Sequence, residues 1–416
     1  MVMCFRAKKP FYGYAITAAG FMVWFIGWGT YTPSFSVFLK PLLAEFGWSR
    51  ADASLAYSLS FLVLGVLGVV MGYLTDRLGP RVVVAGLGSM LGVCYLLLSQ
   101  IENLWQFQAV YAVLGGVGVS TLTTPVMVTV SRWFARKRAT MIGIVQAGMG
   151  IGGFLFPPFA GWLIISYGWR TAYAVLGVIA LVGLVAAGLF LRRDPQGMGQ
   201  LPDGAVLMVA PQQPQDGEDP AAGFSLRQAL RAGGFWIVVA LFCTFGFCRS
   251  AFLAHLAAHV QDVGYTLADG ANVVALLVGA SMFGRIGMGS LADKIGNRTT
   301  FVISFAMTTG SLVLGLVTRD LMGLYLFAFI FGVAWGNQAV LRFSLASEVF
   351  GLGSLGTIVG VLNFFESAAA TVGSYLAGWI FDTSGSYGPV FWIGIGVSVA
   401  GAVLAWVVKP LHRAVP

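Results

Sequence analysis

The amino-acid sequence predicts an all-α membrane protein with twelve transmembrane helices, arranged as two six-helix bundles related by a pseudo-two-fold axis. Three observations support this fold class. Of the 416 residues, 58% are hydrophobic and only 10% are charged, whereas soluble domains carry about 25% charged residues. The apolar residues form long runs, and roughly 20 such residues cross a bilayer. A ten-residue charged pattern also occurs twice, 217 positions apart.

The apolar runs give the predicted spans in chain order. They cover residues 12–38, 53–74, 82–100, 105–131, 139–166, 171–191, 233–260, 267–291, 299–317, 322–348, 355–381 and 387–408. The first run follows a short basic segment, but it is too long for a signal peptide and no small-residue cleavage site follows it. We therefore expect the first span to remain part of the protein.

One hydrophilic segment divides the chain into two halves. Residues 193–232 are rich in Pro, Gly, Gln and Asp, a composition that buries too little apolar surface to fold alone. We interpret this segment as a cytoplasmic linker. The predicted domains are an N-terminal six-helix bundle at 1–192 and a C-terminal six-helix bundle at 233–416.

The distribution of the 24 lysine and arginine residues predicts the orientation. Seventeen of them fall in the two terminal segments and in the connections after spans 2, 4, 6 and 8, whereas four fall in the other connections, namely Lys40, Arg50, Arg170 and Arg319. Basic residues are retained on the cytoplasmic side, so we expect both termini in the cytoplasm and the chain in a bacterial-type plasma (inner) membrane. This topology explains the net charge of +8 without a nucleic-acid partner.

The repeated pattern reads GYLTDRLGPR at residues 72–81 and GSLADKIGNR at residues 289–298. The same offset relates Gln146 to Asn363. Each half contains six spans, and an even number of spans gives both halves the same orientation. The halves are therefore predicted to be parallel repeats related by an axis along the membrane normal.

The first copy resembles the signature loop of the major facilitator superfamily, G-x-L-x-D-R-x-G-x-R, and the second copy has Lys294 in place of the first arginine. The stretches KPFYGYAI, SRWFARKRATMIGI and LFLRRDPQGMGQLPDG further resemble the branch that holds monocarboxylate transporters and oxalate/formate exchangers. This resemblance implies a carrier whose central cavity opens alternately to either side. Charged residues of both copies are predicted to form a gate through helix-end contacts and ion pairs: Asp76, Arg77, Arg81, Asp293, Lys294 and Arg298.

Arg285 is the main candidate for binding a substrate. An ionisable group at bilayer depth is costly unless it faces a watery cavity or a partner, and Arg285 lies about 12 Å inside the cytoplasmic end of span 8. In the monocarboxylate branch, the resemblance implies that an arginine in this segment binds the substrate carboxylate. Animal members carry an aspartate four residues earlier, where this chain has Ser281. A structural ion pair of Arg285 stays an open alternative.

Three other charged residues lie within predicted spans. Arg249 in span 7 is interpreted either as a second substrate contact or as a partner of Glu366 in span 11. Arg342 in span 10 either faces the cavity or reaches the membrane surface. Glu366 is the only carboxylate deep within a span, which makes it the best candidate for proton coupling, with an arginine pair and a substrate contact as alternatives.

Polar and aromatic residues complete the candidate site. Tyr31, Tyr57, Gln146 and Asn363 are predicted to contact the substrate together with Ser281. His255 and His259 share one face of span 7 at a spacing of four residues, but two ligands are too few for a metal site. We assign a proton relay to His255 as a hypothesis beside simple packing, and we predict no metal.

These features predict a secondary active transporter of a small organic anion, a monocarboxylate such as lactate or pyruvate, with a dicarboxylate as an alternative. Proton-coupled symport by alternating access is favoured because a co-transported proton cancels the cost of moving an anion against the membrane potential. The rival hypotheses are a proton-driven exporter of a hydrophobic or cationic compound, an anion/anion exchanger and a non-transporting sensor. No catalytic motif predicts an enzyme, no cofactor is expected, and the predicted oligomeric state is a monomer.

Overall fold

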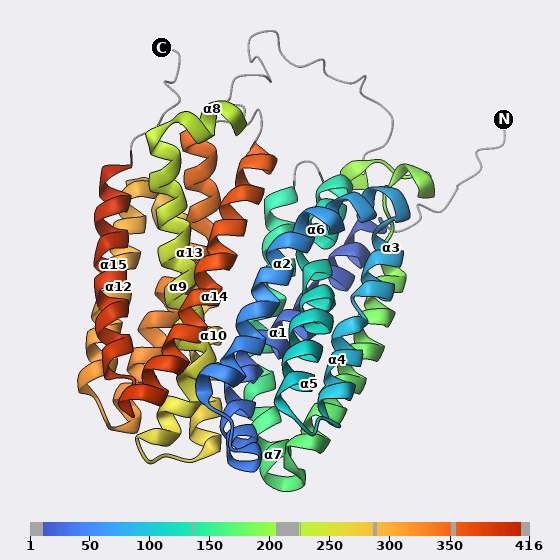
Figure 1. The fold of residues 1–416 in the computed structure, drawn as a ribbon. Helices are drawn as coiled ribbons and strands as arrows, with labels where there is room; N and C mark the ends of the chain where they lie inside the picture. Colours follow the sequence, from blue (N-terminus) through green and yellow to red (C-terminus); the bar gives the residue numbers. More distant parts are fainter. Residues whose placement is uncertain are drawn as a thin grey trace, which may run out of the picture.

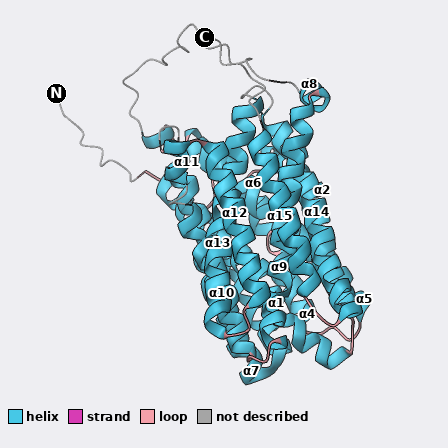
Figure 2. Cartoon of the chain, turned by 90° about the vertical axis from the view of Figure 1, so that its left-hand side faces the viewer, coloured by secondary structure: helices cyan, strands magenta, loops and turns pink. Residues whose placement is uncertain are grey.

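The computed structural model describes residues 11–134, 137–204, 224, 226–285, 289–350 and 355–408. Within these residues all regular secondary structure is helical (Figures 1 and 2). Each of the twelve predicted spans falls on a helix, and eight helices in the described part are long and apolar enough to cross a membrane. The all-α membrane fold is therefore confirmed.

The N-terminal bundle contains six predicted spans. Its helices are α1 (Gly13–Phe46), α2 (Arg50–Leu78), α3 (Pro80–Val82) with η1 (Val83–Leu87) and α4 (Met90–Leu98), α5 (Leu104–Ala109) with η2 (Val110–Gly115) and α6 (Gly116–Trp133), and α7 (Arg138–Phe190). Two predicted spans lie in α7, which is interrupted at Gly168 with φ of 83°. Only glycine adopts this conformation without strain, so the chain reverses there between the spans.

The C-terminal bundle follows the short elements η3 (Gln196–Met198), η4 (Pro202–Gly204) and α8 (Leu226–Arg231). Its helices are α9 (Gly233–Asp262), α10 (Leu267–Phe283), α11 (Gly289–Ile295), α12 (Asn297–Val317), α13 (Leu321–Phe350), α14 (Leu355–Ser384) and α15 (Gly388–Val407). Most of the predicted linker, residues 205–223 and 225, lies outside the described residues, as do the two terminal segments 1–10 and 409–416.

The repeated glycine of the charged pattern has a structural cause. Gly79 follows α2 with φ of 82° and ψ of 156°, and Gly296 precedes α12 with φ of 86° and ψ of 151°. Both positions lie at the sharp turn between two consecutive spans, where a side chain would be strained. The two copies of the pattern therefore build the same turn in each bundle.

The two bundles stand side by side, with α2 against α14 and α7 against α10 (Figure 1). We call the end that carries α8 the linker side and the opposite end the far side. Near the far side, a Cβ atom at Gly378 would lie 2.9 Å from Ala51 Cα. Halfway along α2, a Cβ atom at Gly65 would lie 3.1 Å from Ser367 Cβ.

Beyond this point the two helices separate toward the linker side. Gly68 on α2, Gly360 on α14 and Gly143 on α7 border open space, because an added Cβ atom would meet no described residue within 4 Å. Farther from the linker side, Gly153 on α7 lies directly against Val278 on α10. The bundles are therefore closed against each other at the far side and parted at the linker side.

Close packing within the C-terminal bundle gives a stability prediction. Any Cβ atom at Gly336 on α13 would overlap the carbonyl oxygen of Ser281 on α10. Because overpacking costs about 1–3 kcal/mol, we expect Gly336→Ala to lower the free energy of unfolding and the Tm of the purified protein. Gly310→Ala on α12 is the matched control, since its Cβ atom would enter open space. An unchanged Tm in Gly336→Ala would contradict a rigid contact here.

Candidate functional site

Arg285 lies where the two bundles meet. It follows α10, and its side chain reaches α7 of the other bundle, where Nη1 donates to the Gln146 carbonyl oxygen at 3.4 Å. Nη2 lies 3.5 Å from the thioether sulfur of Met149. The guanidinium carbon also lies 5.7 Å from the ring centre of Trp335 on α13. These contacts are long, and both acceptors are uncharged.

The positive charge of Arg285 has no counter-ion in the described part of the chain. None of the ion pairs formed there includes Arg285. Among the described residues, neither its Nε nor the Nε1 of Trp335 has a hydrogen-bond partner, although both donors are buried. A buried donor left unsatisfied costs about 1–3 kcal/mol, so two neighbouring donors can gain from one carboxylate ligand.

Glu366 forms a second charged group together with Arg249 and Arg342. Glu366 Oε1 lies 3.8 Å from Arg249 Nη2, and Arg342 Nη1 donates to Glu366 Oε2. We call these three residues the Arg–Glu–Arg cluster; they come from α9, α13 and α14. Glu366 is 7% exposed and Arg249 is 8% exposed. A Cβ atom at Gly246 on α9 would lie 2.9 Å from Glu366 Cγ, so glycine there makes room for the glutamate.

Aromatic rings connect the cluster to the N-terminal bundle. The Arg249 guanidinium lies 4.7 Å from the ring centre of Phe61 on α2, which suits a cation–π contact. The Tyr57 ring follows at 4.9 Å from Phe61, and Tyr31 stacks on Tyr57 at 6.5 Å. Both tyrosines are buried, at 0% and 2% exposure. They form an aromatic layer behind Phe61.

The other predicted substrate contacts lie at several depths. Gln146 meets Arg285 through its backbone carbonyl, and its side chain is half-buried. Asn363 is half-buried on α14, nearly one turn before Glu366. Ser281 is fully buried and donates its hydroxyl to the Val278 carbonyl at 2.6 Å. Its hydroxyl hydrogen bond is thus made within its own helix.

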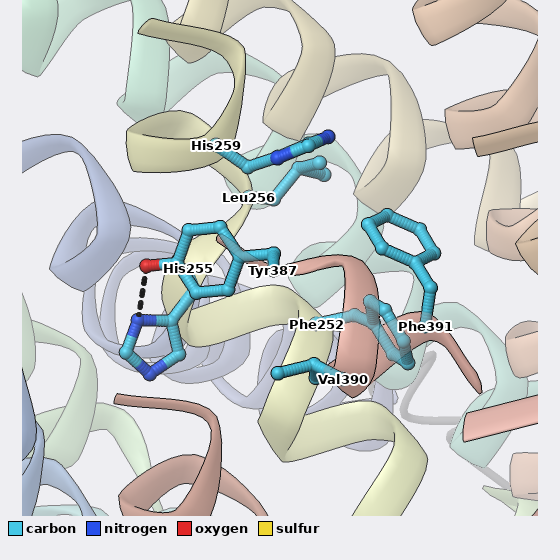
Figure 3. Close-up of a pocket in the computed structure, with 7 residues that line it drawn as sticks. All are labelled: Phe252, His255, Leu256, His259, Tyr387, Val390 and Phe391. Atoms are coloured by element: carbon cyan, nitrogen blue, oxygen red, sulfur yellow. Dashed lines mark hydrogen bonds between the residues drawn. The ribbon is translucent and has the colours of Figure 1, made fainter. Parts of the chain in front are cut away.

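The predicted proton-relay residue His255 lies in a polar network at the far side. Its Nδ1 is 3.0 Å from the Tyr387 hydroxyl (Figure 3), and its Nε2 is 3.0 Å from the Ser374 carbonyl and 3.2 Å from the Ser54 hydroxyl. Since a carbonyl only accepts, Nε2 carries the proton and Nδ1 accepts from Tyr387. His259 lies across a small apolar cavity from this pair, with room for about one water molecule.

Ion pairs across the bundle interface continue this network. Arg50 at the start of α2 donates to Asp262 with Nη1 at 2.6 Å and Nη2 at 2.9 Å, and to the Tyr387 hydroxyl at 2.7 Å. Lys40 adds a second ion pair to Asp262 at 2.7 Å. The Asp382 carboxylate accepts from the backbone amides of Arg50 and Ala51 at 3.0 and 2.7 Å.

The complete set, here called the far-side network, is Lys40, Arg50, His255, Asp262, Asp382 and Tyr387. Sequence reasoning placed only His255 in a functional role. Lys40 and Arg50 stood out as two of the four basic residues in the sparsely charged connections, but nothing in the sequence indicated their partners.

The predicted gate residues at the linker side contact only their own bundles within the described residues. Asp76 accepts from Arg132 of α6 at 2.8 Å. Arg77 and Arg298 lie over Tyr73 and Trp406 at 4.8 and 5.0 Å from the ring centres. Arg81 and Lys294 are exposed, and the side chain of Asp293 lies outside the described residues. A gate at this side stays a prediction for another conformation.

Taken together, Arg285 and the Arg–Glu–Arg cluster carry three arginines and one glutamate, a net charge of +2 when all are ionised. Both groups are largely withdrawn from solvent and lie near the meeting of the two bundles. This arrangement is suited to binding a carboxylate, because arginine presents two parallel donors and keeps its charge.

Comparison with known proteins agrees with this architecture. The chain is 26% identical over 409 residues to Monocarboxylate transporter 13 of Bos taurus, covering 96% of this chain and 90% of that protein. It is 28% identical over 395 residues to the agnestins efflux protein AgnL12 of Paecilomyces divaricatus, covering 93% and 85%. A bacterial homologue of the human lysosomal transporter Spinster, solved inward-facing and unoccupied, superposes with a TM-score of 0.71 at 16% identity, covering 97% and 96%.

The family model described as Major Facilitator Superfamily matches residues 16–373 and 273–416, which together span nearly the whole chain. Members of this family are transporters and not enzymes, and the relatives that match this chain include several monocarboxylate transporters. The chain therefore belongs to the Major Facilitator Superfamily and resembles its monocarboxylate transporters.

Proposed function

We propose that this transporter carries a small organic anion, with Arg285 and Trp335 holding one carboxylate between the bundles. The observation that carries the proposal is the buried guanidinium of Arg285, which has no counter-ion among the described residues. A cargo carboxylate would supply the missing charge and accept from the two unpaired donors. The names of the relatives in mammals and birds agree with a monocarboxylate such as lactate or pyruvate.

The arrangement of contacts supports alternating access as the mechanism. The far-side network joins the two bundles at one end. Toward the linker side, Gly68, Gly143 and Gly360 border open space among the described residues. With the linker side in the cytoplasm, as basic residues favour, this conformation is inward-facing. Opening to the outside then requires Arg50 and Lys40 to leave Asp262.

Proton coupling is the finer part of the proposal. Glu366 is the carboxylate of the Arg–Glu–Arg cluster, and its two arginines hold it in place. A proton that enters with the anion would keep the transported charge at zero, which removes a cost of about 2.3 kcal/mol per charge per 100 mV. Symport into the cytoplasm is the favoured direction.

Uptake into proteoliposomes tests the proposed function. We expect labelled lactate or pyruvate to accumulate when the outside is made acidic, and the accumulation to collapse when a protonophore removes the gradient. A labelled lipophilic cation serves as the competing cargo, because one relative is an efflux protein. Transport of the cation with no carboxylate transport would replace the anion carrier by an exporter.

A further inference from the structure

We infer that Arg249 and Arg342 form a second carboxylate subsite, and that Glu366 occupies it until Glu366 is protonated. This subsite extends the proposed function, because it adds to the carboxylate site at Arg285 and names the class of substrate that uses both. The glutamate acts as a built-in substitute for a cargo carboxylate. A dicarboxylate can then bind with one end at Arg285 and the other end in the cluster.

The geometry of the Arg–Glu–Arg cluster supports this interpretation. The Glu366 carboxylate receives one arginine on each oxygen, as a bound carboxylate would. Its contact with Arg249 is long, at 3.8 Å, and Arg249 Nε is buried without a hydrogen-bond partner. Arg249 therefore retains donor capacity that Glu366 does not use. Trp335, which neighbours Arg285, and Arg342 lie seven residues apart on α13, about two turns and ~10.5 Å along one face of that helix.

The cluster lies where a ligand from the linker side can approach it. Glu366 precedes Ser367, which packs closely against Gly65 of α2. Among the described residues, Gly68, about one turn farther along α2, and Gly360, about two turns farther along α14, border open space. The Phe61 ring of α2 covers Arg249. Because α2 belongs to the other bundle, a movement between the bundles changes how far Phe61 covers this subsite.

Charge balance links the proton to the cargo. With Glu366 ionised, the cluster holds two positive charges and one negative charge. When Glu366 takes up a proton on a carboxylate oxygen and a cargo carboxylate pairs with the arginines, the net charge stays +1. No covalent bond of the cargo changes, and the proton remains on Glu366. Binding of a second carboxylate is therefore coupled to uptake of one proton.

Few other titratable groups face Glu366 in the described chain. Arg249 and Cys243 come from α9, and Arg342 comes from α13. From α2, Tyr57 lies behind the Phe61 ring that covers Arg249. Arginines stay charged across the accessible pH range, so both positive charges of the subsite are kept when Glu366 takes up a proton.

The test compares a matched pair of four-carbon acids, succinate and butyrate, by isothermal titration calorimetry on the purified full-length protein. If only the protonated form accepts a second carboxylate, the apparent Kd of succinate rises about tenfold per pH unit wherever Glu366 is mostly ionised. The slope is measured between about pH 6.5 and 8.5, where free carboxylic acids are ionised. Butyrate, bound at Arg285 alone, is expected to show little change.

Glu366→Gln should open the subsite permanently. Succinate is then expected to bind with a pH slope near zero, and at about pH 8.5 at least tenfold more tightly than to the wild type. Glu348→Gln is the matched control, because Glu348 is exposed and contacts Asn297 near the end of α13. It should leave both slopes unchanged.

Two outcomes would overturn the subsite, and both differ from failure of the proposed function. Equal pH slopes for succinate and butyrate in the wild type would exclude it even if the Glu366→Gln variant does not fold. An unchanged succinate slope in a folded Glu366→Gln protein would exclude it as well. If neither acid binds at any pH, the anion carrier itself is wrong.

Discussion

Replacing Arg285 with alanine is expected to reduce carboxylate uptake, measured as kcat/KM, by about 30-fold or more. The variant removes the guanidinium that would pair with the cargo, and truncating one partner of a buried charge pair costs about 2–5 kcal/mol. Each 1.4 kcal/mol corresponds to about tenfold. Arg285→Lys keeps the charge but loses the two parallel donors, so we expect an intermediate loss of about tenfold.

The measurement is initial uptake of labelled lactate into proteoliposomes that contain equal amounts of folded protein. Arg319→Ala is the matched control, because Arg319 is an exposed arginine in a far-side connection, and it should transport at the wild-type rate. Trp335→Phe removes the Nε1 donor together with part of the aromatic ring system and should raise KM by about 5–10-fold. Wild-type kcat/KM in Arg285→Ala would contradict the assignment of the carboxylate site.

Much of the fold could be predicted from the sequence because its signals are local or periodic. Long apolar runs identify the spans, and the repeated pattern identifies the two bundles. The repeat also marks Gly79 and Gly296, whose left-handed backbone requires glycine. Gly168 shows the limit of this reasoning: the run around it was divided into two spans, but the helices join there with only one non-helical residue.

The candidate site could be predicted only in part. Counting residues along a span gives the depth of a side chain in the membrane, but its ion-pair partner depends on which helices pack against each other. Arg249 and Glu366 are 117 positions apart, and their pairing follows from α9 packing against α14. The sequence left that pairing as one of two alternatives. Tyr31 and Tyr57 were assigned to the substrate from their residue type, yet they lie one aromatic layer behind Phe61.

The far-side network was missed for the same reason. Arg50 begins one helix and Asp262 ends another, and Asp382 approaches from a third. No sequence spacing connects residues that far apart. Only the closed far side of this conformation brings them together, so a sequence-based search for charge within the spans passed over them.

Asp262→Asn is expected to shift the protein toward a conformation that is open at the far side, by about 30–1,000-fold in the equilibrium constant. The Arg50 side chain is 9% exposed. While the far side is closed, the variant leaves the buried Arg50 guanidinium without its negatively charged partner. Such a loss costs about 2–4 kcal/mol in partly buried pairs. In the open conformation water solvates the freed groups, so that state is not penalised.

Two reporter cysteines in a cysteine-free background measure the shift. Ser58→Cys lies on α2 against α14 and is fully buried in this conformation, whereas Gly143→Cys borders open space toward the linker side. In Asp262→Asn, labelling by a membrane-impermeant maleimide should become faster at position 58 from the far side and slower at position 143 from the linker side. Unchanged labelling rates at both positions would contradict a role of the Arg50–Asp262 contact in holding the far side closed.

Control variants separate the network from general far-side charge. Glu45→Gln removes an ion pair to Arg170 that lies within the N-terminal bundle, so it should not alter either labelling rate. Lys40→Ala should shift the equilibrium less than tenfold, because the Lys40 side chain is 27% exposed and exposed pairs contribute about 0–1 kcal/mol.

Arg50→Ala should shift the equilibrium as far as Asp262→Asn. The double variant should shift it little further, since both changes remove the same contact. If Lys40→Ala shifted the equilibrium as far as Arg50→Ala, net charge at the far side would control the opening instead of the Arg50–Asp262 contact.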